Sequence, residues 1–198
     1  MQLDPVIIIK AFGSLGLLAI IFAESGLFFG FFLPGDSLLF SAGLLASAGY
    51  LNPWVLLLFC PLAAILGDNV GFWFGQRVGP RIFFKENSFF FNKKYIDQTR
   101  AFYEKHGKKT IIFARFVPIV RTFAPILAGV GNMDYKIFFR FNVLGGIFWT
   151  TSMLVLGFFL GNLIPDIDRY IFPVIGILIL LSIAPIIFQV LRRKTNKV

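Results

Sequence analysis

The chain has 198 residues, of which 57% are hydrophobic and only 15% are charged, whereas about a quarter of the residues in an ordinary soluble domain are charged. Its 27 Phe residues occur along the whole length, so lipid or packed protein must surround nearly every segment. This composition excludes a water-soluble fold. It predicts a single all-α integral membrane domain over residues 1–198.

The net charge of +9 comes from basic residues that are unevenly placed. Nine of them lie between Arg77 and Lys109, and four more lie between Arg192 and Lys197. This distribution is a topology signal rather than a nucleic-acid signal. The single Cys60 excludes a disulfide framework and a cysteine-based metal site, and we expect no metal, no cofactor and no nucleic-acid partner.

Three apolar runs are long enough to cross a bilayer, which takes about 20 helical residues. They are Pro53–Gly75, Phe141–Ile164 and Ile171–Leu191. We predict transmembrane helices at 53–78, 135–161 and 171–191, followed by a short cytoplasmic tail at 192–198.

Two other apolar regions, 11–50 and 110–133, are interrupted near their middles. The first is broken at Leu33-Pro34-Gly35-Asp36, and the second around Pro118 and Arg121. Each leg of the second region is about 18 Å long as helix and too short to cross. We therefore predict two re-entrant hairpins whose tips face protein or a cavity. The alternative that part of Ala11–Phe32 is a fourth full span is open.

The positive-inside rule orients these elements. It places the basic loop at 79–109 in the cytoplasm, with an amphipathic helix over Asn92–His106 against anionic headgroups, and it also places the C-terminus there. The first hairpin then enters from the outer face and the second from the cytoplasmic face, so their tips oppose each other.

A glycine pattern suggests an internal repeat. Gly43 and Gly129 each end a hairpin, and each is followed 28 positions later by a Gly-x-x-x-Gly segment that begins at Gly71 or Gly157. Two copies inserted from opposite faces would form an inverted repeat, as in secondary transporters.

Charged residues in apolar segments mark sites by default, because each costs at least about 2.5 to 3.5 kcal/mol on insertion scales. Opposed hairpin tips would bring Glu24 and Asp36 near Arg115 and Arg121. A phosphate headgroup could then take the arginines from the carboxylates, and a displaced carboxylate would bind a proton more readily. A structural ion-pair lock is the competing interpretation. Asp68 and Asn69 are further candidates, and Pro34, Gly35 and Pro118 are assigned to hairpin geometry.

Several separated motifs resemble the DedA family, over about Gly13 to Gly161. They are Glu24 with Phe32-Leu-Pro-Gly-Asp36, Gly67-Asp-Asn-Val-Gly71, Phe113-Ala-Arg-Phe-Val-Pro-Ile-Val-Arg121, and Ala128-Gly with Met133, Phe138, Asn142 and Trp149. The resemblance implies a multi-pass protein of the bacterial plasma membrane with two opposed re-entrant hairpins. It also implies lipid translocation, of undecaprenyl phosphate or phosphatidylethanolamine, that requires the acidic pair Glu24 and Asp36 and the arginine pair.

We therefore expect a lipid flippase, with membrane lipids as partners and room for oligomerisation. The main alternative is a proton-coupled antiporter of small solutes. An enzyme such as a lipid phosphatase is not expected, because no nucleophile or metal cluster is evident. A non-catalytic membrane organiser would leave the intramembrane charges with only a structural role.

Overall fold

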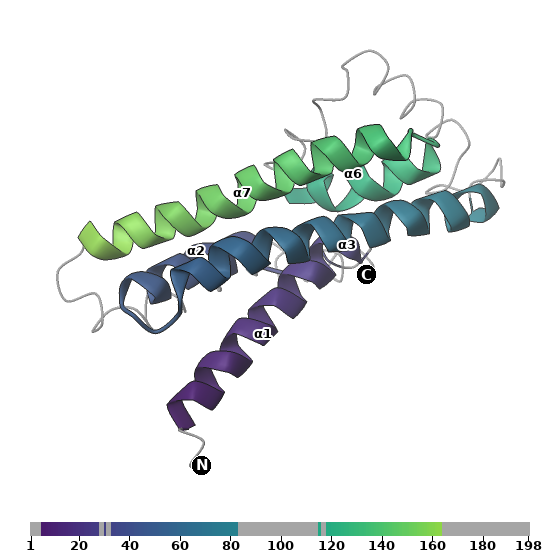
Figure 1. The fold of residues 1–198 in the computed structure, drawn as a ribbon. Helices are drawn as coiled ribbons and strands as arrows, with labels where there is room; N and C mark the ends of the chain where they lie inside the picture. The colour runs from purple at the N-terminus through teal and green to yellow at the C-terminus, as the bar shows by residue number, and fades with distance from the viewer. Residues whose placement is uncertain (1–4, 28–29, 31–32, 83–114, 116–117, 164–198) are drawn as a thin grey trace, which may run out of the picture. The chain divides into compact units, whose positions relative to one another are not determined.

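The structure, a computed structural model, describes residues 5–27, 30, 33–82, 115 and 118–163. The described segments form five α-helices: α1 (Pro5–Gly26), α2 (Gly35–Ser47), α3 (Pro53–Ile82), α6 (Pro118–Val130) and α7 (Tyr135–Leu163) (Figure 1). No strand occurs within these ranges. The predicted helices at 92–106 and 171–191, the tail at 192–198 and the first leg of the second hairpin, apart from Arg115, lie outside the described residues.

Two of the described helices are long and apolar enough to cross a membrane, through Pro53–Val78 and Tyr135–Leu163. Both begin directly after a capping residue. The side chain of Asn52 accepts a bond of 2.9 Å from the amide of Trp54, and that of Asp134 accepts one of 3.1 Å from the amide of Ile137. Such bonds satisfy amides that have no partner within the helix.

The first hairpin differs in its boundaries from the prediction. Helix α1 begins at Pro5 rather than at residue 11, and its 22 residues give a length of about 33 Å. It ends at Gly26, well before the predicted break at Leu33, and α2 begins only at Gly35. Between the two helices, the Leu27 carbonyl accepts a local bond from the amide of Gly30, at 2.8 Å.

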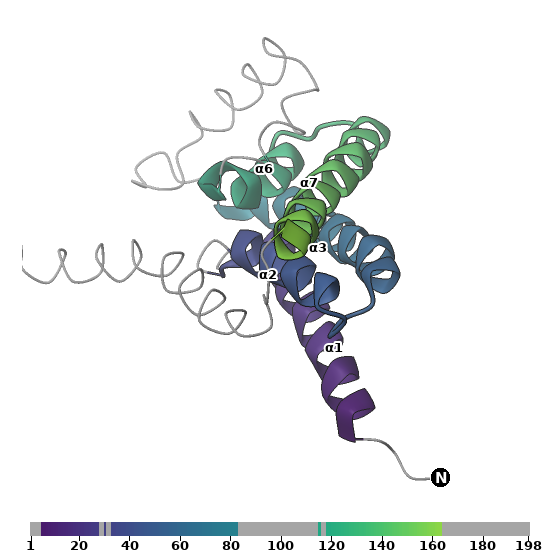
Figure 2. The same ribbon diagram turned by 90° about the vertical axis from the view of Figure 1, so that its left-hand side faces the viewer.

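The described chain divides into two compact units, each built from separate stretches of sequence. In the first unit, α2 packs closely on the second half of α7 (Figure 2). A Cβ on Gly43 would overlap the carbonyl oxygen of Leu154, and one on Gly157 would overlap that of Phe40. Only glycine permits this approach of two helix backbones.

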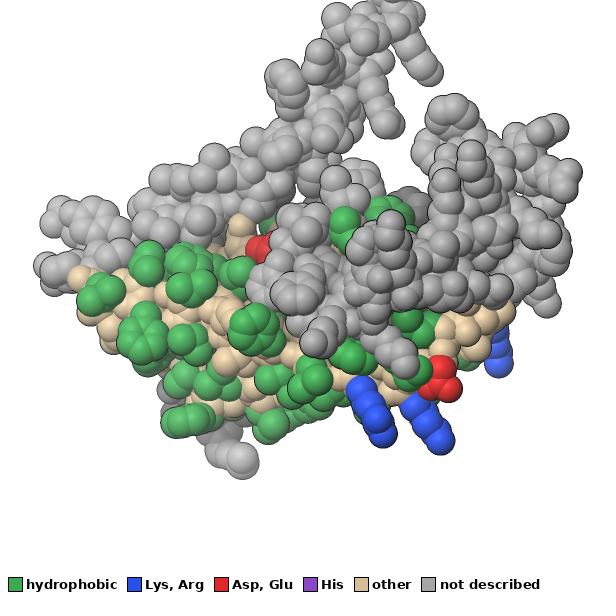
Figure 3. Space-filling view, turned by 90° about the horizontal axis from the view of Figure 1, so that it is seen from above, with side chains coloured by type: hydrophobic (Ala, Val, Ile, Leu, Met, Phe, Trp, Pro, Cys, Tyr) green, Lys and Arg blue, Asp and Glu red, His purple; other side chains and the backbone are tan. Residues whose placement is uncertain are grey.

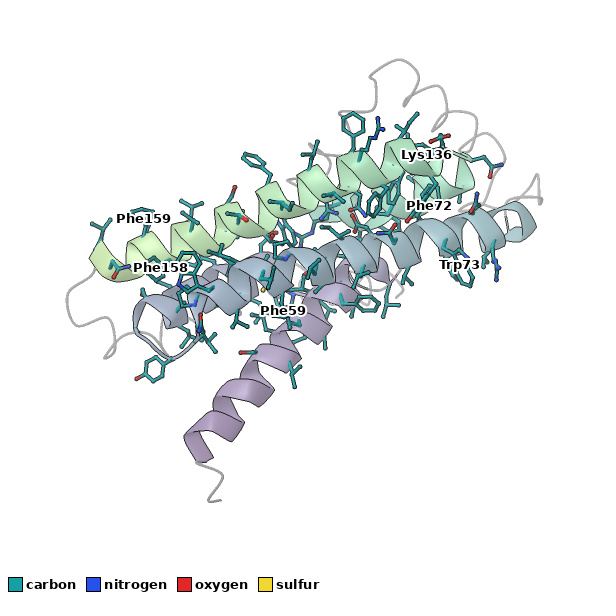
Figure 4. The ribbon with its side chains drawn as sticks, in the orientation of Figure 1. Phe59, Phe72, Trp73, Lys136, Phe158 and Phe159 are labelled. Carbon is teal, nitrogen blue, oxygen red and sulfur yellow. The ribbon has the colours of Figure 1, made fainter. Side chains whose placement is uncertain are left out.

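In the second unit, α6 packs in the same way on α3. A Cβ on Gly129 would overlap the carbonyl oxygen of Phe72, and one on Gly75 would overlap that of Ile126. The ring of Phe72 lies between α3 and α7, whereas Trp73 points away from α7 (Figure 4). Phe72 stacks on Phe138 with the ring centroids 4.4 Å apart, in a core that includes Ala128.

The contacts within the two units repeat. The α2 positions 40 and 43 correspond to 126 and 129 in α6, an offset of 86, as the glycine pattern predicted. The spanning helices correspond at another offset, because Gly75 rather than Gly71 matches Gly157, which is 82 positions later. The capping residues Asn52 and Asp134 obey this second offset too. The segment from the packing glycine to the capping residue is nine positions long in the first copy, Gly43 to Asn52, and five in the second, Gly129 to Asp134, which accounts for the difference of four between the two offsets.

Candidate functional site

The second unit contains four of the five charged residues singled out in the sequence. Glu24 is 1% exposed, Asp68 3% and Arg115 5%, and the side chain of Arg121 is 10% exposed. An isolated charge in such surroundings would be strongly disfavoured, since the desolvation penalty is several kcal/mol per ion. The four groups therefore have to be paired, and the structure shows two pairs.

Arg121 pairs with Glu24. The first lies in the opening turn of α6 and the second in the last turn of α1, and Nη2 of the arginine donates to Oε1 of the glutamate. The guanidinium also lies over the ring of Trp149, 4.7 Å from its centroid. A cation over an indole ring is attracted to the ring's negative face, so the carboxylate of Glu24 and the ring of Trp149 hold Arg121 by different interactions.

Arg115 pairs with Asp68, the carboxylate of α3. Its Nη2 donates to Oδ2 of Asp68 and to Oδ1 of Asn142. Asn142 is fully buried and donates in turn to the carbonyl oxygen of Ile65, at 3.1 Å. The amide is thus bonded on both sides, which fixes its orientation and that of the arginine it accepts from.

Glycines allow the helices that carry these charges to come close. Gly26 and Gly67 meet where α1 passes α3, and a Cβ on either would lie 3.1 Å or less from backbone atoms of the other helix. At Gly146 of α7, a Cβ would lie 2.8 Å from the side chain of Ile65 and 3.5 Å from Nη2 of Arg115. Larger residues at these positions would move the charged groups apart.

Three buried polar atoms near the pairs have no hydrogen-bond partner within the described part of the chain. They are Oε2 of Glu24, Nε of Arg115 and Oγ1 of Thr122. Leaving such groups unpaired costs about 1–3 kcal/mol each. A ligand that supplied an acceptor oxygen to Nε of Arg115, or a donor to Oε2 of Glu24, would relieve that cost.

Comparison with known proteins assigns the chain to a family. The sequence model of the VTT domain matches residues 33–159. The protein DedA of Escherichia coli K12 is 44% identical over 180 residues, which cover 90% of this chain and 82% of that protein. The chain belongs to the DedA family.

Other relatives carry membrane-protein names. An uncharacterised membrane protein of Mycobacterium leprae is 45% identical over 85% of this chain and 75% of its own length. The inner membrane protein YqjA of Escherichia coli K12 is 30% identical over 87% of this chain and 78% of its own length. This DedA family member is therefore an all-α membrane protein. No solved structure matches it.

Two ion pairs of this DedA family member join Arg121 to Glu24, as predicted for that arginine and carboxylate, and Arg115 to a third carboxylate. The partner of Arg115 is Asp68, which the sequence ranked below the other two carboxylates. Asp36 belongs to the first unit, where it is half-buried in the first turn of α2. Its position in that turn is favourable, because the amides at a helix N-terminus attract negative charge.

The remaining predicted residues have mainly local roles in the described structure. Pro34 occupies the N-cap position of α2 without a side-chain capping bond, Gly35 is the first residue of that helix, and Pro118 is the first residue of α6. A proline is well suited to that place, because an amide there would have no helical partner. Asn69 donates to the carbonyl oxygen of Ile65 at 2.7 Å and accepts a bond from the hydroxyl of Tyr135 at 3.0 Å, which ties α3 to α7.

Sequence reasoning gave no contact role to two residues of the cluster, Asn142 and Trp149. Asn142 was noted only as a family motif residue, although an amide within a predicted span is itself a signal of a polar network. Trp149 is likewise only a family motif residue in the sequence, and its burial, at 1% exposed, does not follow from the hydrophobic pattern. Within the described residues no three His, Cys, Asp or Glu side chains form a group that could hold a metal ion.

Proposed function

We propose that this protein moves phosphate-bearing lipids, undecaprenyl phosphate or phosphatidylethanolamine, across the bacterial plasma membrane. Arg115 and Arg121 would bind the headgroup phosphate. The observation that carries the proposal is the presence of two buried guanidiniums, each ion-paired with a buried carboxylate, in a protein that belongs to a membrane family. A guanidinium presents a planar fork of donors that matches phosphate oxygens.

The guanidiniums have unused capacity for such a ligand. Arg115 makes its bonds to Asp68 and Asn142 through Nη2, while its Nε is buried without a partner in the described part of the chain. A phosphate oxygen at Nε would satisfy this donor. Charge-assisted bonds of this type are about twice as strong as neutral ones.

Transport would proceed by exchange of partners. When phosphate takes Arg121, the carboxylate of Glu24 loses its cation in a buried place, where a lone negative charge is strongly disfavoured. Uptake of a proton by Glu24 would then offset that loss, and release of the lipid would restore the pair. Asp68 would act in the same way toward Arg115, a role that the sequence assigned to Glu24 and Asp36. This exchange couples lipid movement to protons.

Two features of the described helices support the re-entrant arrangement that transport needs. Helix α1 ends against Gly67, near the middle of the span Pro53–Val78, and not at either end of it. Helix α6 has 13 residues, about 20 Å, which is too short to cross a hydrocarbon core of about 30 Å. The end of α1 that carries Glu24 and the start of α6 that carries Arg121 would therefore both lie within the depth of the membrane.

The proposed topology is multi-pass with a cytoplasmic C-terminus, and an anionic lipid surface would face the basic residues on that side. Arg77, Lys136 and Arg140, near the end of α3 and the start of α7, are exposed, consistent with this. Replacing Lys197 by Cys in a Cys60→Ala background tests it. A membrane-impermeant maleimide should label intact cells only after permeabilisation, and labelling without it would contradict the topology.

The decisive experiment is reconstitution into vesicles with labelled undecaprenyl phosphate and labelled phosphatidylethanolamine, assayed in parallel. Arg115→Ala and Arg121→Ala should abolish movement of the transported lipid, because each removes a phosphate donor. Arg140→Ala, which removes an exposed arginine from α7, is the matched control and should transport at the wild-type rate. Wild-type transport by both site variants would refute the headgroup role, and proton-driven solute exchange without lipid movement would favour the antiporter.

A further inference from the structure

The first unit contains an open apolar groove with a volume of about 330 Å³. Helix α2 contributes Gly43, the start of α3 contributes Trp54 and Leu56, and the second half of α7 contributes Leu154 and Phe158. Every residue along it is hydrophobic or glycine. A charged ligand would find no partner in such a place.

The corresponding place in the second unit is filled. By the offset of 82 between the spanning helices, Leu56 corresponds to Phe138, Pro53 to Tyr135, and Leu154 to Phe72 on the other span. Phe72 stacks on Phe138 at 4.4 Å and lies 5.8 Å from the ring of Tyr135. Three aromatic rings thus occupy the position that two leucines and a proline leave open.

The two units share the same arrangement of helices at this place. The groove therefore results from the smaller side chains at these positions in the first unit. Protein interiors are normally packed with few voids, and the second unit shows that this junction can be packed. The first unit keeps it hollow, and hydrophobic side chains along the groove are exposed, Trp54 at 78% and Phe159 at 63%. On the face seen in Figure 3, hydrophobic side chains are spread widely over the described part of the surface.

We infer that this groove binds the hydrocarbon chain of a lipid. The inference rests on the proposed function for a lipid as the ligand, and it adds a chain site to the headgroup site. Both flanking helices, α3 and α7, are of membrane-spanning length, so hydrocarbon chains surround the groove. A chain has no polar group to satisfy, whereas an extended peptide would bury amides and carbonyls without partners.

The test uses the full-length protein in vesicles that contain a phospholipid with a diazirine on its acyl chain. After irradiation, labelled positions are mapped by mass spectrometry. Groove residues such as Trp54 and Phe158 should be labelled more strongly than Leu66 and Leu144, which are exposed on the same two spans at 57% and 58%. Equal labelling at the two sets would mean only bulk lipid contact and would overturn the inference.

A double variant closes the groove by copying the second unit, with Leu56→Phe and Leu154→Phe. Labelling of the groove should fall at least about five-fold, because the added rings take the space of the chain. The control, Leu66→Phe with Leu144→Phe, adds the same rings at exposed positions and should leave groove labelling unchanged. Undiminished labelling in a correctly folded plugged protein would contradict a bound chain. If the plugged protein does not fold, the comparison of positions in the wild type still decides.

The labelling does not depend on transport, so the two proposals can fail separately. Arg115→Ala, which should not transport, should still be labelled in the groove at the wild-type level. If the plugged variant loses groove labelling while Arg115→Ala and Arg121→Ala transport lipid at the wild-type rate, the headgroup role is refuted and the groove proposal stands. If the plugged variant keeps its labelling while the arginine variants lose transport, only the groove proposal is refuted.

Discussion

The guanidinium of Arg121 lies over the indole ring of Trp149, 4.7 Å from the ring centroid, while its Nη2 bonds to Glu24. The contact with the ring does not involve the carboxylate. Trp149 can therefore hold the arginine in place when a phosphate replaces Glu24. This makes Trp149 a positioning residue for the proposed exchange.

Replacing Trp149 by Leu should weaken lipid binding more than replacing it by Phe, which keeps an aromatic face. A desolvated cation–π contact is worth about 2 kcal/mol, so we expect the apparent affinity in Trp149→Leu to fall about thirty-fold. The measurement is the dependence of transport on lipid concentration. Trp73→Leu, on an exposed ring, is the control, and equal affinities in the Leu and Phe variants would contradict the positioning role.

A double-mutant cycle on Arg115 and Asp68 separates structural from functional roles. Asp68→Asn leaves the guanidinium without its counter-charge and should destabilise the protein by about 3–5 kcal/mol. Arg115→Met should do the same to the carboxylate. The double variant should recover much of this loss, because neither charge is then left alone.

Transport gives the second readout of the same cycle. If Arg115 binds phosphate, the double variant should be stable in heated detergent extracts, as judged by size-exclusion chromatography, and still inactive. An active double variant would show that the pair only locks α3 in place. Stability and transport thus answer different questions about one ion pair.

Much of the site was predictable from the sequence, because an intramembrane charge is conspicuous. Glu24, Arg115 and Arg121 were singled out for that reason, and the structure brings each to a buried partner. The pairing itself was not predictable, since it depends on which turn of α3 faces Arg115. The sequence pattern did not identify Asp68 as the partner of Arg115, because Asp68 lies in a glycine-rich helix whose faces could contact either lipid or protein.

The fold was predictable where it depends on length and hydrophobicity. The spans that begin at Pro53 and Tyr135 have the predicted starts, because Asn52 and Asp134 cap them. The register of the repeat was not predictable from the sequence. Glycines four residues apart on each span allow two alignments that differ by one helical turn, with Gly157 matched either to Gly71 or to Gly75. Only the contact partners of Gly75 and Gly157 show that these two glycines correspond.

The shared glycine contacts predict a common sensitivity to substitution. Alanine at Gly43, Gly75, Gly129 or Gly157 would place a Cβ against a backbone carbonyl of the neighbouring helix, so each should lower the thermal stability clearly. Gly16→Ala, where nothing lies within 4 Å, should be neutral or stabilising by about 0.5–1 kcal/mol. Stability of all four packing variants at the wild-type level would contradict the close helix contacts.

Asn142 should act through Arg115 rather than on the lipid directly. Asn142→Ala removes an acceptor from the guanidinium and a donor from the carbonyl of Ile65, at a stability cost of about 1–3 kcal/mol. Transport should fall together with affinity, because the arginine is no longer held in one orientation. Asn142→Gln keeps both groups and should recover part of the activity, and no recovery would point to packing alone.

Proton coupling predicts a specific loss in Glu24→Gln. The amide still accepts a bond from Arg121, so the helix contact between α1 and α6 should persist, but it cannot take up a proton when phosphate arrives. Lipid movement in vesicles should then lose its response to an imposed pH gradient while a passive rate remains. The matched comparison is Asp36→Asn in the first unit, because Asp36 was predicted to share this role and lies in a different helix end. A wild-type pH response in Glu24→Gln would mean that Glu24 is a structural partner of Arg121, and that any proton is carried by Asp36, Asp68 or another group.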